Sequence, residues 1–442
     1  MNYKCATNRL LNSYRKKKHE SKNNLIALFM ICYNEEKIID RFLEHILCIK
    51  ELLCNFTVVT NSSDATIPKI QEWTAKHGIS FSWKFKEFKN FAEQRKASFD
   101  FCREKCPQAQ YYLTLDADHC LKLINMNSFL SELKSGDMLA MKEKLGSNEG
   151  YNYRIFSQRI ILDCWVGTHE CWESCTPNEI RKNIEYLYVE DKSDGGSHDV
   201  KFTRDIRILN EELVRIKYWE EHDMKDYDGS KVSKHKYDIY KHRVNFYLGQ
   251  SYGCLDKYKL AAKYYLLRTL LGGFEEEVYI SYWKAGYSYE KLAWLYRDIC
   301  GKFDGGIVGR SQQKKLINNN ISVDNLTLLQ FYQKTHKYFC KAIQLYNQAQ
   351  QVRPTRGEAQ YQLVTLQRSL QNHHLAVLEA EKGREISKPS DLFQVNNDIY
   401  RHLFDMELLF TGVAKCSNPF FAEIAASAKR RLIKNNIIRE IN

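Results

Sequence analysis

The sequence has little of what linkers and disulfide scaffolds are made from. Its 442 residues include 6 prolines and 20 glycines, which is too few for long flexible or proline-rich linkers. Its 14 cysteines are scattered, and none form the Cys-x-x-Cys pairs of a zinc finger. We therefore expect free thiols in a reducing compartment rather than a disulfide framework.

Long apolar runs are missing too. No stretch of 18 apolar residues predicts a membrane span, and the first residues do not resemble a signal peptide. The hydrophobic fraction of 44% and the aromatic fraction of 13% argue against a disordered chain and indicate packed cores. The net charge of +12 favours either an anionic ligand or a lysine-rich solvated surface. We expect a cytoplasmic protein with two or three domains and no nucleic-acid partner.

The most informative stretch is residues 111–118, an apolar strand pattern that ends in two acidic residues. Asp116 and Asp118 are two positions apart, so on an extended segment their side chains project to the same side. Open α/β sheets bind ligands beyond the carboxyl ends of their strands. Carboxylate oxygens suit Mg²⁺ or Mn²⁺, which often bridge protein to phosphates. The pair predicts a metal-held diphosphate, and the alternative is a polar turn.

Strand and helix patterns alternate through the first third of the chain. This alternation predicts an α/β fold with a parallel, doubly wound, Rossmann-like sheet. Polar residues follow three of the predicted strands, at 34–36, 61–66 and 116–118, and parallel strands would bring them to one crevice. The predicted strands are 25–32, 56–60, 79–85 and 111–115, and the predicted helices are 38–47, 67–77 and 91–106.

Strand patterns disappear from about residue 240 onward. The remaining sequence is helical and rich in tyrosine, and Ala342 and Ala376 lie 34 positions apart, which is the period of a tetratricopeptide repeat. We predict an all-α domain of this kind, with an ordinary helical bundle as the alternative. The Gly- and Asn-rich residues 301–325 predict an insertion loop.

Four segments resemble the nucleotide-sugar half of family-two glycosyltransferases with the GT-A fold. They are Leu28–Glu36, Ser62–Thr66, Asn90–Arg95 and Leu113–Asp118. Later segments, Glu190–Asp205 and Arg243–Tyr252 among them, resemble a subgroup with a C-terminal tetratricopeptide-like region.

Residues 1–24 are polar and basic and predict an N-terminal extension. The resemblance implies a GT-A domain over 25–215 and a tetratricopeptide-like domain over 235–442. It also implies an inverting glycosyltransferase that uses Mn²⁺ or Mg²⁺ and a nucleotide-sugar, with a UDP-sugar as the expected donor. The acceptor would be a glycan, a lipid-linked molecule or a protein, and the helical domain would bind a protein partner or form a homodimer. Two alternatives stay open: an inactive scaffold that works through its repeats, and a nucleotidyltransferase.

The resemblance also assigns roles to individual residues. One departure stands out: Val59 and Thr60 occupy the place of an acidic residue that touches the nucleotide in the family, so the base is left open. Trp165 and Trp172 flank Glu170, the expected catalytic base, and they would either stack on a sugar or belong to the core. The nucleotide-sugar residues would be Tyr33, Asn34, Glu35, Asp64, Arg95 and Asp116, with Lys201 and Arg204 neutralising the diphosphate. The metal ligands would be Asp116 and Asp118, and a base would follow them in the chain. From the residues themselves we choose His198 as a further metal ligand and Glu170 or, second, Asp191 as the base, with His169 orienting Glu170 or binding the acceptor. The alternatives are a surface carboxylate for Glu170 and a structural histidine for His169.

Overall fold

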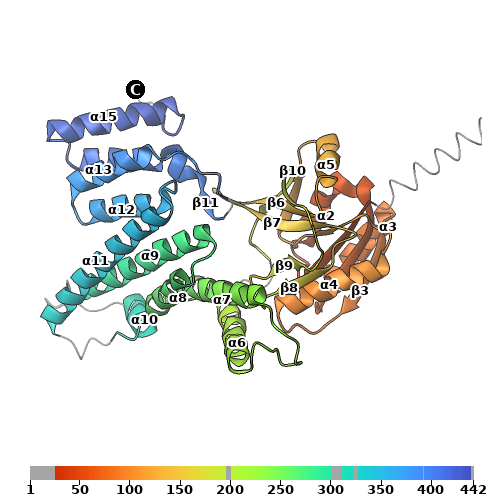
Figure 1. Cartoon of the computed structure of the whole chain (residues 1–442). Helices are drawn as coiled ribbons and strands as arrows, with labels where there is room; N and C mark the ends of the chain where they lie inside the picture. Colours follow the sequence, from red (N-terminus) through yellow and green to blue (C-terminus); the bar gives the residue numbers. More distant parts are fainter. Residues whose placement is uncertain (1–24, 196–200, 301–309, 322–326, 392, 440–442) are drawn as a thin grey trace, which may run out of the picture. The chain divides into compact units, whose positions relative to one another are not determined.

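The computed structural model describes residues 25–195, 201–300, 310–321, 327–391 and 393–439. They divide into two compact units, one ending at Lys201 and one beginning at Phe202 (Figure 1). The first unit contains the sheet and the second is helical. Helix α6 (Lys201–Glu221) lies almost wholly in the second unit, although the GT-A domain was expected to extend to residue 215.

Eight strands of the first unit form a mixed sheet in the order β3-β2-β1-β4-β7-β6-β10-β5. Strands β3, β2, β1 and β4 are parallel neighbours, as predicted. The later strands make the sheet mixed, because β7 runs antiparallel to both β4 and β6. A tight hairpin turn with Gly146 at φ 59° joins β6 to β7, and this conformation favours glycine. The strands are β1 (Ile26–Cys32), β2 (Leu53–Thr60), β3 (Ser80–Phe85), β4 (Tyr111–Thr114), β5 (His119–Leu123), β6 (Met138–Leu145), β7 (Asn148–Ser157) and β10 (Arg181–Asp191).

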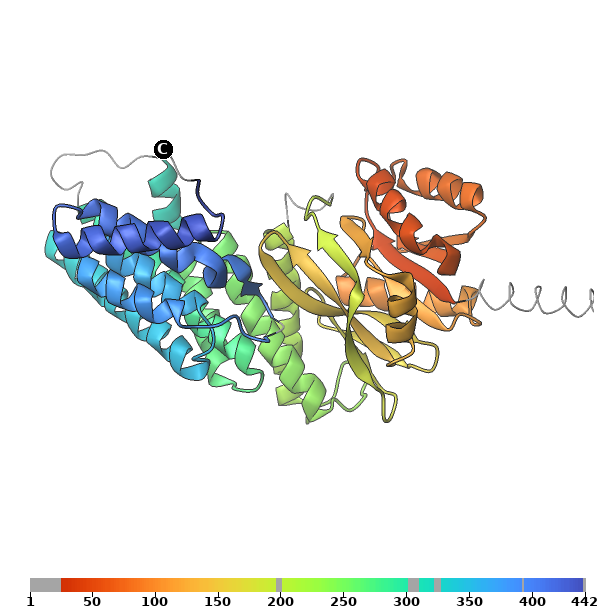
Figure 2. The same cartoon turned by 90° about the horizontal axis from the view of Figure 1, so that it is seen from above.

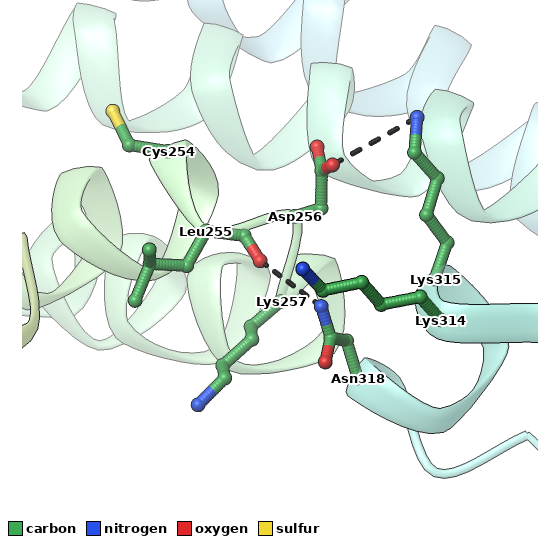
Figure 3. Close-up of a pocket in the computed structure, with 7 residues that line it drawn as sticks. All are labelled: Cys254, Leu255, Asp256, Lys257, Lys314, Lys315 and Asn318. Carbon is green, nitrogen blue, oxygen red and sulfur yellow. Dashed lines mark hydrogen bonds and ion pairs between the residues drawn. The ribbon is translucent and has the colours of Figure 1, made fainter. Parts of the chain in front are cut away.

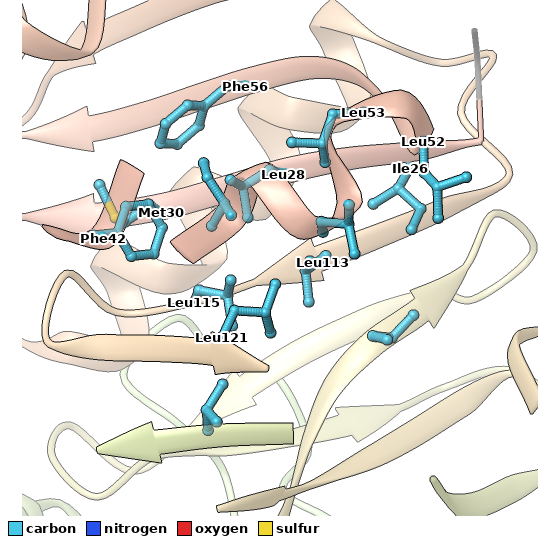
Figure 4. Packing of buried hydrophobic residues seen from close by; sticks show 14 of the residues in the cluster. Ile26, Leu28, Met30, Phe42, Leu52, Leu53, Phe56, Leu113, Leu115 and Leu121 are labelled. Carbon is cyan, nitrogen blue, oxygen red and sulfur yellow. The ribbon is translucent and has the colours of Figure 1, made fainter. Parts of the chain in front are cut away.

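Apolar side chains fill both faces of this sheet, which explains the uninterrupted apolar run of β1. Leu28 and Met30 point to one face, where they join a cluster that includes Phe42 (Figure 4). Phe29 points to the other face and packs against Trp172. Strands covered on both sides lose the alternation of polar and apolar residues. The helices and remaining strands of this unit are α2 (Ile39–Ile46), η1 (Leu47–Leu52), α3 (Thr66–His77), α4 (Phe91–Lys105), α5 (Met126–Leu133), β8 (Leu162–Trp165) and β9 (Cys171–Ser174).

The second unit is a series of helices, most of which pack side by side with the next helix along the chain (Figure 2). The all-α prediction is confirmed, and the tetratricopeptide assignment stays a prediction. A Cβ on Gly286 would lie 2.7 Å from the Tyr346 ring, so glycine allows α9 and α11 to cross closely. Helices and the short strand are α6 (Lys201–Glu221), α7 (Lys234–Cys254), α8 (Tyr258–Leu270), α9 (Glu275–Cys300), α10 (Arg310–Asn318), α11 (Leu328–Val352), α12 (Glu358–Ser369), α13 (His373–Arg384), β11 (Val395–Asn396), η2 (Ile399–Leu403), α14 (Phe404–Ala414) and α15 (Pro419–Lys434).

Helix α10 corrects the prediction of an insertion loop over 301–325, at least for residues 310–318. The asparagines that suggested a loop instead bind the turn between α7 and α8. Asn318 and Asn319 donate side-chain hydrogen bonds to the carbonyls of Leu255 and Asp256, at 3.4 and 2.8 Å. Within the described residues, no helix combines the length and the apolar character needed to cross a membrane.

Candidate functional site

The loops that follow β1 and β2 are tied together by hydrogen bonds at the carboxyl edge of the sheet. The Asn34 N–H donates to Ser62 Oγ at 2.8 Å, and the Ser63 N–H donates to Asn34 Oδ1 at 2.9 Å. Asn34 has φ 55°, a left-handed conformation that asparagine tolerates better than most residues. Two of the predicted polar clusters therefore do meet, and Tyr33 beside them is 47% exposed.

Asp64 also connects the loops that follow β1 and β2. Its Oδ1 accepts hydrogen bonds from the Thr66 N–H (3.0 Å) and hydroxyl (2.6 Å), and its Oδ2 accepts from the Glu36 N–H (3.1 Å). Burial works against the charged form, but these hydrogen bonds lower the pKa of Asp64. Both oxygens of Asp64 thus hold the loops in place, and its expected contact with a nucleotide stays a prediction.

Asp116 lies between two arginines. Its Oδ1 is 2.8 Å from Arg95 Nη1, and its Oδ2 is 3.1 Å from Arg154 Nη1. Arg95 comes from α4 and Arg154 from β7, and both side chains are almost completely buried. Burial alone would raise the pKa of Asp116, but the two guanidinium groups hold it well below its ordinary value. Asp116 is therefore an ionised carboxylate whose two oxygens already face cations.

The ion pairs continue beyond both arginines. Arg95 also pairs with Glu170, and Arg154 Nε is 2.7 Å from Glu143 Oε1 on β6. The result is a chain of alternating charge in the order Glu170, Arg95, Asp116, Arg154, Glu143. It joins α4, the ends of β4 and β6, β7 and the segment before β9.

His119 packs against Asp116 as a neutral imidazole. Burial, and then the charge of Arg154, lower the pKa of His119. The Asp116 N–H donates to His119 Nδ1 at 3.2 Å, and a neutral imidazole has just one acceptor nitrogen. The Nε2 atom therefore carries the proton and lies 3.6 Å from Asp116 Oδ2, beyond hydrogen-bond distance. His119 is thus tied to Asp116 through the backbone N–H of that residue.

A second group, of like charge, lies beside this chain. Asp118, His119 and Asp191 have ligand-type atoms within 4.8 Å of one another, because β10 pairs with β5 so that Asp191 faces His119. Burial, and then the charges of Asp116, Asp191 and Glu35, raise the pKa of Asp118 to about 7. Asp118, Asp191 and Glu35, hereafter the acidic cluster, form the kind of concentrated negative charge that a divalent cation would relieve.

The loop over residues 191–195 covers the acidic cluster. Arg41 on α2 holds it through a bidentate pair with Asp194, at 2.6 and 2.7 Å. A Cβ on Gly195 would lie 3.5 Å from both Asp118 Oδ2 and Glu35 Oε1. These two carboxylates therefore face the same point of the loop backbone.

Glu170 and His169 lie on a strained segment between β8 and β9. Val166 has φ 69° and His169 has φ 52°, and a β-branched residue in this region is an outlier. The Phe91 N–H at the start of α4 donates to the Gly167 carbonyl at 2.7 Å. Backbone strain of this kind gathers at functional sites. Trp172 nearby belongs to the core, where it packs against Phe29, Phe99 and Phe156.

The structure thus brings together Glu35, Arg95, Asp116, Asp118, Glu170 and Asp191, which were all predicted. His198 lies outside the described residues. Lys201 begins α6, and Arg204 on that helix pairs with Asp205 at 3.2 Å in the second unit. Sequence reasoning missed Arg154, Glu143, His119 and Arg41; the only signal was an arginine within the apolar pattern of 153–156.

A separate open cavity of about 500 Å³ lies in the second unit (Figure 3). Lys257, Lys314 and Lys315 line it, and Lys315 is 3.8 Å from Asp256. None of the predicted site residues lines this cavity, so the acidic cluster and its arginines are the candidate site.

No protein-family model and no curated protein matches the chain. Among solved structures it is similar to S. aureus TarS, with a TM-score of 0.30 and 13% identity over 56% of this chain and 52% of that one. A second structure, S. aureus TarS 1-349 in complex with UDP, gives a TM-score of 0.28 and 12% identity over 56% of this chain and 86% of that one. The chain thus covers about half of the first structure.

Proposed function

We propose that the chain is an inverting glycosyltransferase that takes its donor sugar from a nucleotide-sugar bound with Mn²⁺ or Mg²⁺. The observation that supports this most is the acidic cluster at the carboxyl edge of the parallel strands, next to buried Arg95 and Arg154. Such an edge is where open α/β sheets bind ligands. These charges support the binding of a cation and of phosphate groups. The glycosyl transfer itself is the reaction that the family-two motifs imply.

The donor atoms fit a hard divalent cation. Asp118 and Asp191 would hold it, and Glu35 offers a further carboxylate oxygen beside Asp118. Mg²⁺ and Mn²⁺ prefer oxygen ligands and keep positions for phosphate and water. Asp116 was expected to be a ligand, but its two oxygens face arginines, so we assign it to orienting Arg95. When bound, the cation would stabilise the negative charge of the departing diphosphate.

An inverting transfer also needs a base for the acceptor hydroxyl. We assign this role to Glu170 rather than Asp191, because Asp191 belongs to the acidic cluster. Arg95 fixes Glu170 in place, and neighbouring His169 is the candidate to orient the acceptor. The acceptor itself, glycan or protein, and the part of the helical unit in binding it follow from the resemblance alone.

A donor panel tests the proposal. UDP-, GDP-, TDP- and CMP-sugars are added with Mn²⁺, and both the melting temperature and slow donor hydrolysis are measured. We expect one nucleotide class to stabilise the protein, since a ligand of the native state raises its apparent stability. Asp118→Asn and Asp191→Asn should lower donor hydrolysis by a factor of about 100.

Asp40→Asn is the matched control, because Asp40 is an exposed carboxylate on α2 that pairs with Lys69. It should behave like the unmodified protein. Stabilisation by no nucleotide-sugar would contradict the proposal, and release of pyrophosphate from a nucleoside triphosphate would identify a nucleotidyltransferase instead. Binding without any turnover would point to the inactive scaffold.

A further inference from the structure

The position of Asp116 raises a question about the cation site. The carboxylate lies next to the acidic cluster, close enough for its charge to raise the pKa of Asp118. Yet its Oδ2 is turned toward Arg154, and its Oδ1 toward Arg95. Each oxygen therefore already faces a positive charge, and this lowers the affinity of Asp116 for a further cation.

Arg154 is itself held firmly. Its Nε is 2.7 Å from Glu143 Oε1, while its Nη1 reaches Asp116. Glu143 in turn accepts a hydrogen bond from Asn152 on the same strand as Arg154, at 3.3 Å. A guanidinium fixed on both sides keeps its geometry, so the orientation of Asp116 is set by β6 and β7 rather than by the ligand.

We propose that Arg154 is a positioning residue that withholds Asp116 from the cation and so makes cation binding depend on the diphosphate. The inference rests on the proposed function. Cation affinity at oxygen sites rises with the number of charged ligands. With Asp116 withheld, the acidic cluster alone binds the cation weakly, and the phosphate oxygens of the donor complete the site.

Removing Arg154 should therefore produce a gain rather than a loss. In Arg154→Met, Asp116 Oδ2 loses its guanidinium partner and a buried positive charge disappears, so Mn²⁺ binding without nucleotide should tighten about fivefold or more. The extra stabilisation that UDP or GDP gives in the presence of Mn²⁺ should shrink. Arg154→Lys keeps the charge and should stay close to the unmodified protein.

Mn²⁺ affinity is measured on the full chain from the electron paramagnetic resonance signal of free Mn²⁺, with Arg159→Met as the control. Arg159 lies just beyond the C-terminal end of β7 and pairs with Asp137 rather than with Asp116, so its loss should leave Mn²⁺ affinity unchanged. The double variant Arg154→Met with Asp116→Asn should lose the gain, because the released carboxylate is then absent. If Arg154→Met does not fold, Arg154→Gln replaces it, with the same expected direction.

A merely structural Arg154 would give a different result. Suppose that the unmodified protein binds Mn²⁺ with UDP or GDP, but the Mn²⁺ affinity of Arg154→Met stays unchanged or falls. This result overturns the inference about Arg154 and leaves the proposed function standing. Failure of the unmodified protein to bind Mn²⁺ with either nucleotide overturns both.

Discussion

Two regions of the molecule contain closely spaced charges, and these charges are balanced differently. In the helical unit, the side chain of Arg356 is fully buried, yet it lies 2.8 Å from Glu358 and 3.2 Å from Asp391. It also donates to the carbonyls of Phe393 and Gln394, both at 3.0 Å. In the acidic cluster, by contrast, carboxylates face carboxylates, and the pKa of Asp118 is raised to about 7 by burial and by these neighbours.

This difference distinguishes charges that stabilise the fold from charges that are balanced only when a ligand binds. A buried ion that has all its partners costs little further energy, whereas like charges brought together destabilise the fold unless something else compensates them. Proteins retain such an arrangement where function requires it, which is why perturbed carboxyl groups are common at active sites. The comparison makes opposite predictions for mutations in the two regions.

The largest effect should come from the matched network. Arg356→Met would leave Glu358 and Asp391 buried without their cation, and breaking a buried pair in this way costs about 3–5 kcal/mol of unfolding free energy. Urea unfolding of the full chain measures the loss. Lys382→Met is the control, since Lys382 is 69% exposed and surface pairs contribute about 0–1 kcal/mol. Equal stability of the two variants would mean that burial of Arg356 does not matter.

The acidic cluster should respond in the opposite direction. Asp118→Asn removes one of several repelling charges, so without added cation it should stabilise the protein by about 1 kcal/mol while it lowers donor hydrolysis by a factor of about 100. Urea unfolding in a chelator, compared with the same experiment in Mn²⁺ and donor, separates the two effects. A substantial loss of stability in the chelator would show that Asp118 is a structural residue, and the contrast with Arg356 would fail.

The sequence predicted the positions of Asp116 and Asp118 much better than the position of Arg154. Asp116 and Asp118 follow an apolar strand directly, so strand periodicity alone places them at the ligand edge of the sheet. Arg154 lies 38 positions away and meets Asp116 only because β7 pairs antiparallel with β4. Nothing local specifies that pairing, and an arginine within a strand normally indicates a solvent-facing position. The same reason explains why the antiparallel pairing of β7 with β4 was not predicted.

Asp191 and Asp64 show two kinds of information that the sequence does not contain. Asp191 was predicted as an alternative base, but the register of β10 against β5 sets it beside His119 and Asp118, and register is a property of the folded sheet. Asp64 matched a nucleotide-binding motif, yet its oxygens accept hydrogen bonds from Thr66 and Glu36. A motif identifies the residue type at a strand end, whereas the hydrogen-bond partners decide what that residue does.

The smallest effect should come from a third kind of charge, a paired one near the surface. Arg159 Nε is 2.6 Å from Asp137 Oδ1, and the hydrogen bonds from Arg159 are the main cause that lowers the pKa of Asp137 to about 2. The side chain of Arg159 is 48% exposed, so solvent screens the pair and weakens its contribution. Arg159→Met should therefore destabilise the protein less than Arg356→Met.

The loss of unfolding free energy in Arg159→Met should depend on pH, which distinguishes an ion pair from packing. Because the pKa of Asp137 is lower in the folded protein than in the unfolded chain, the pair stabilises the fold above about pH 4 and loses this contribution as the pH falls toward 2. The difference in unfolding free energy between Arg159→Met and the unmodified protein should be full at pH 6 and should shrink below pH 4. Urea unfolding at pH 6, 4 and 3 measures it. A difference that stays constant across this range would mean that Arg159 acts through packing of its aliphatic stem, since only the ion pair depends on the charge of Asp137.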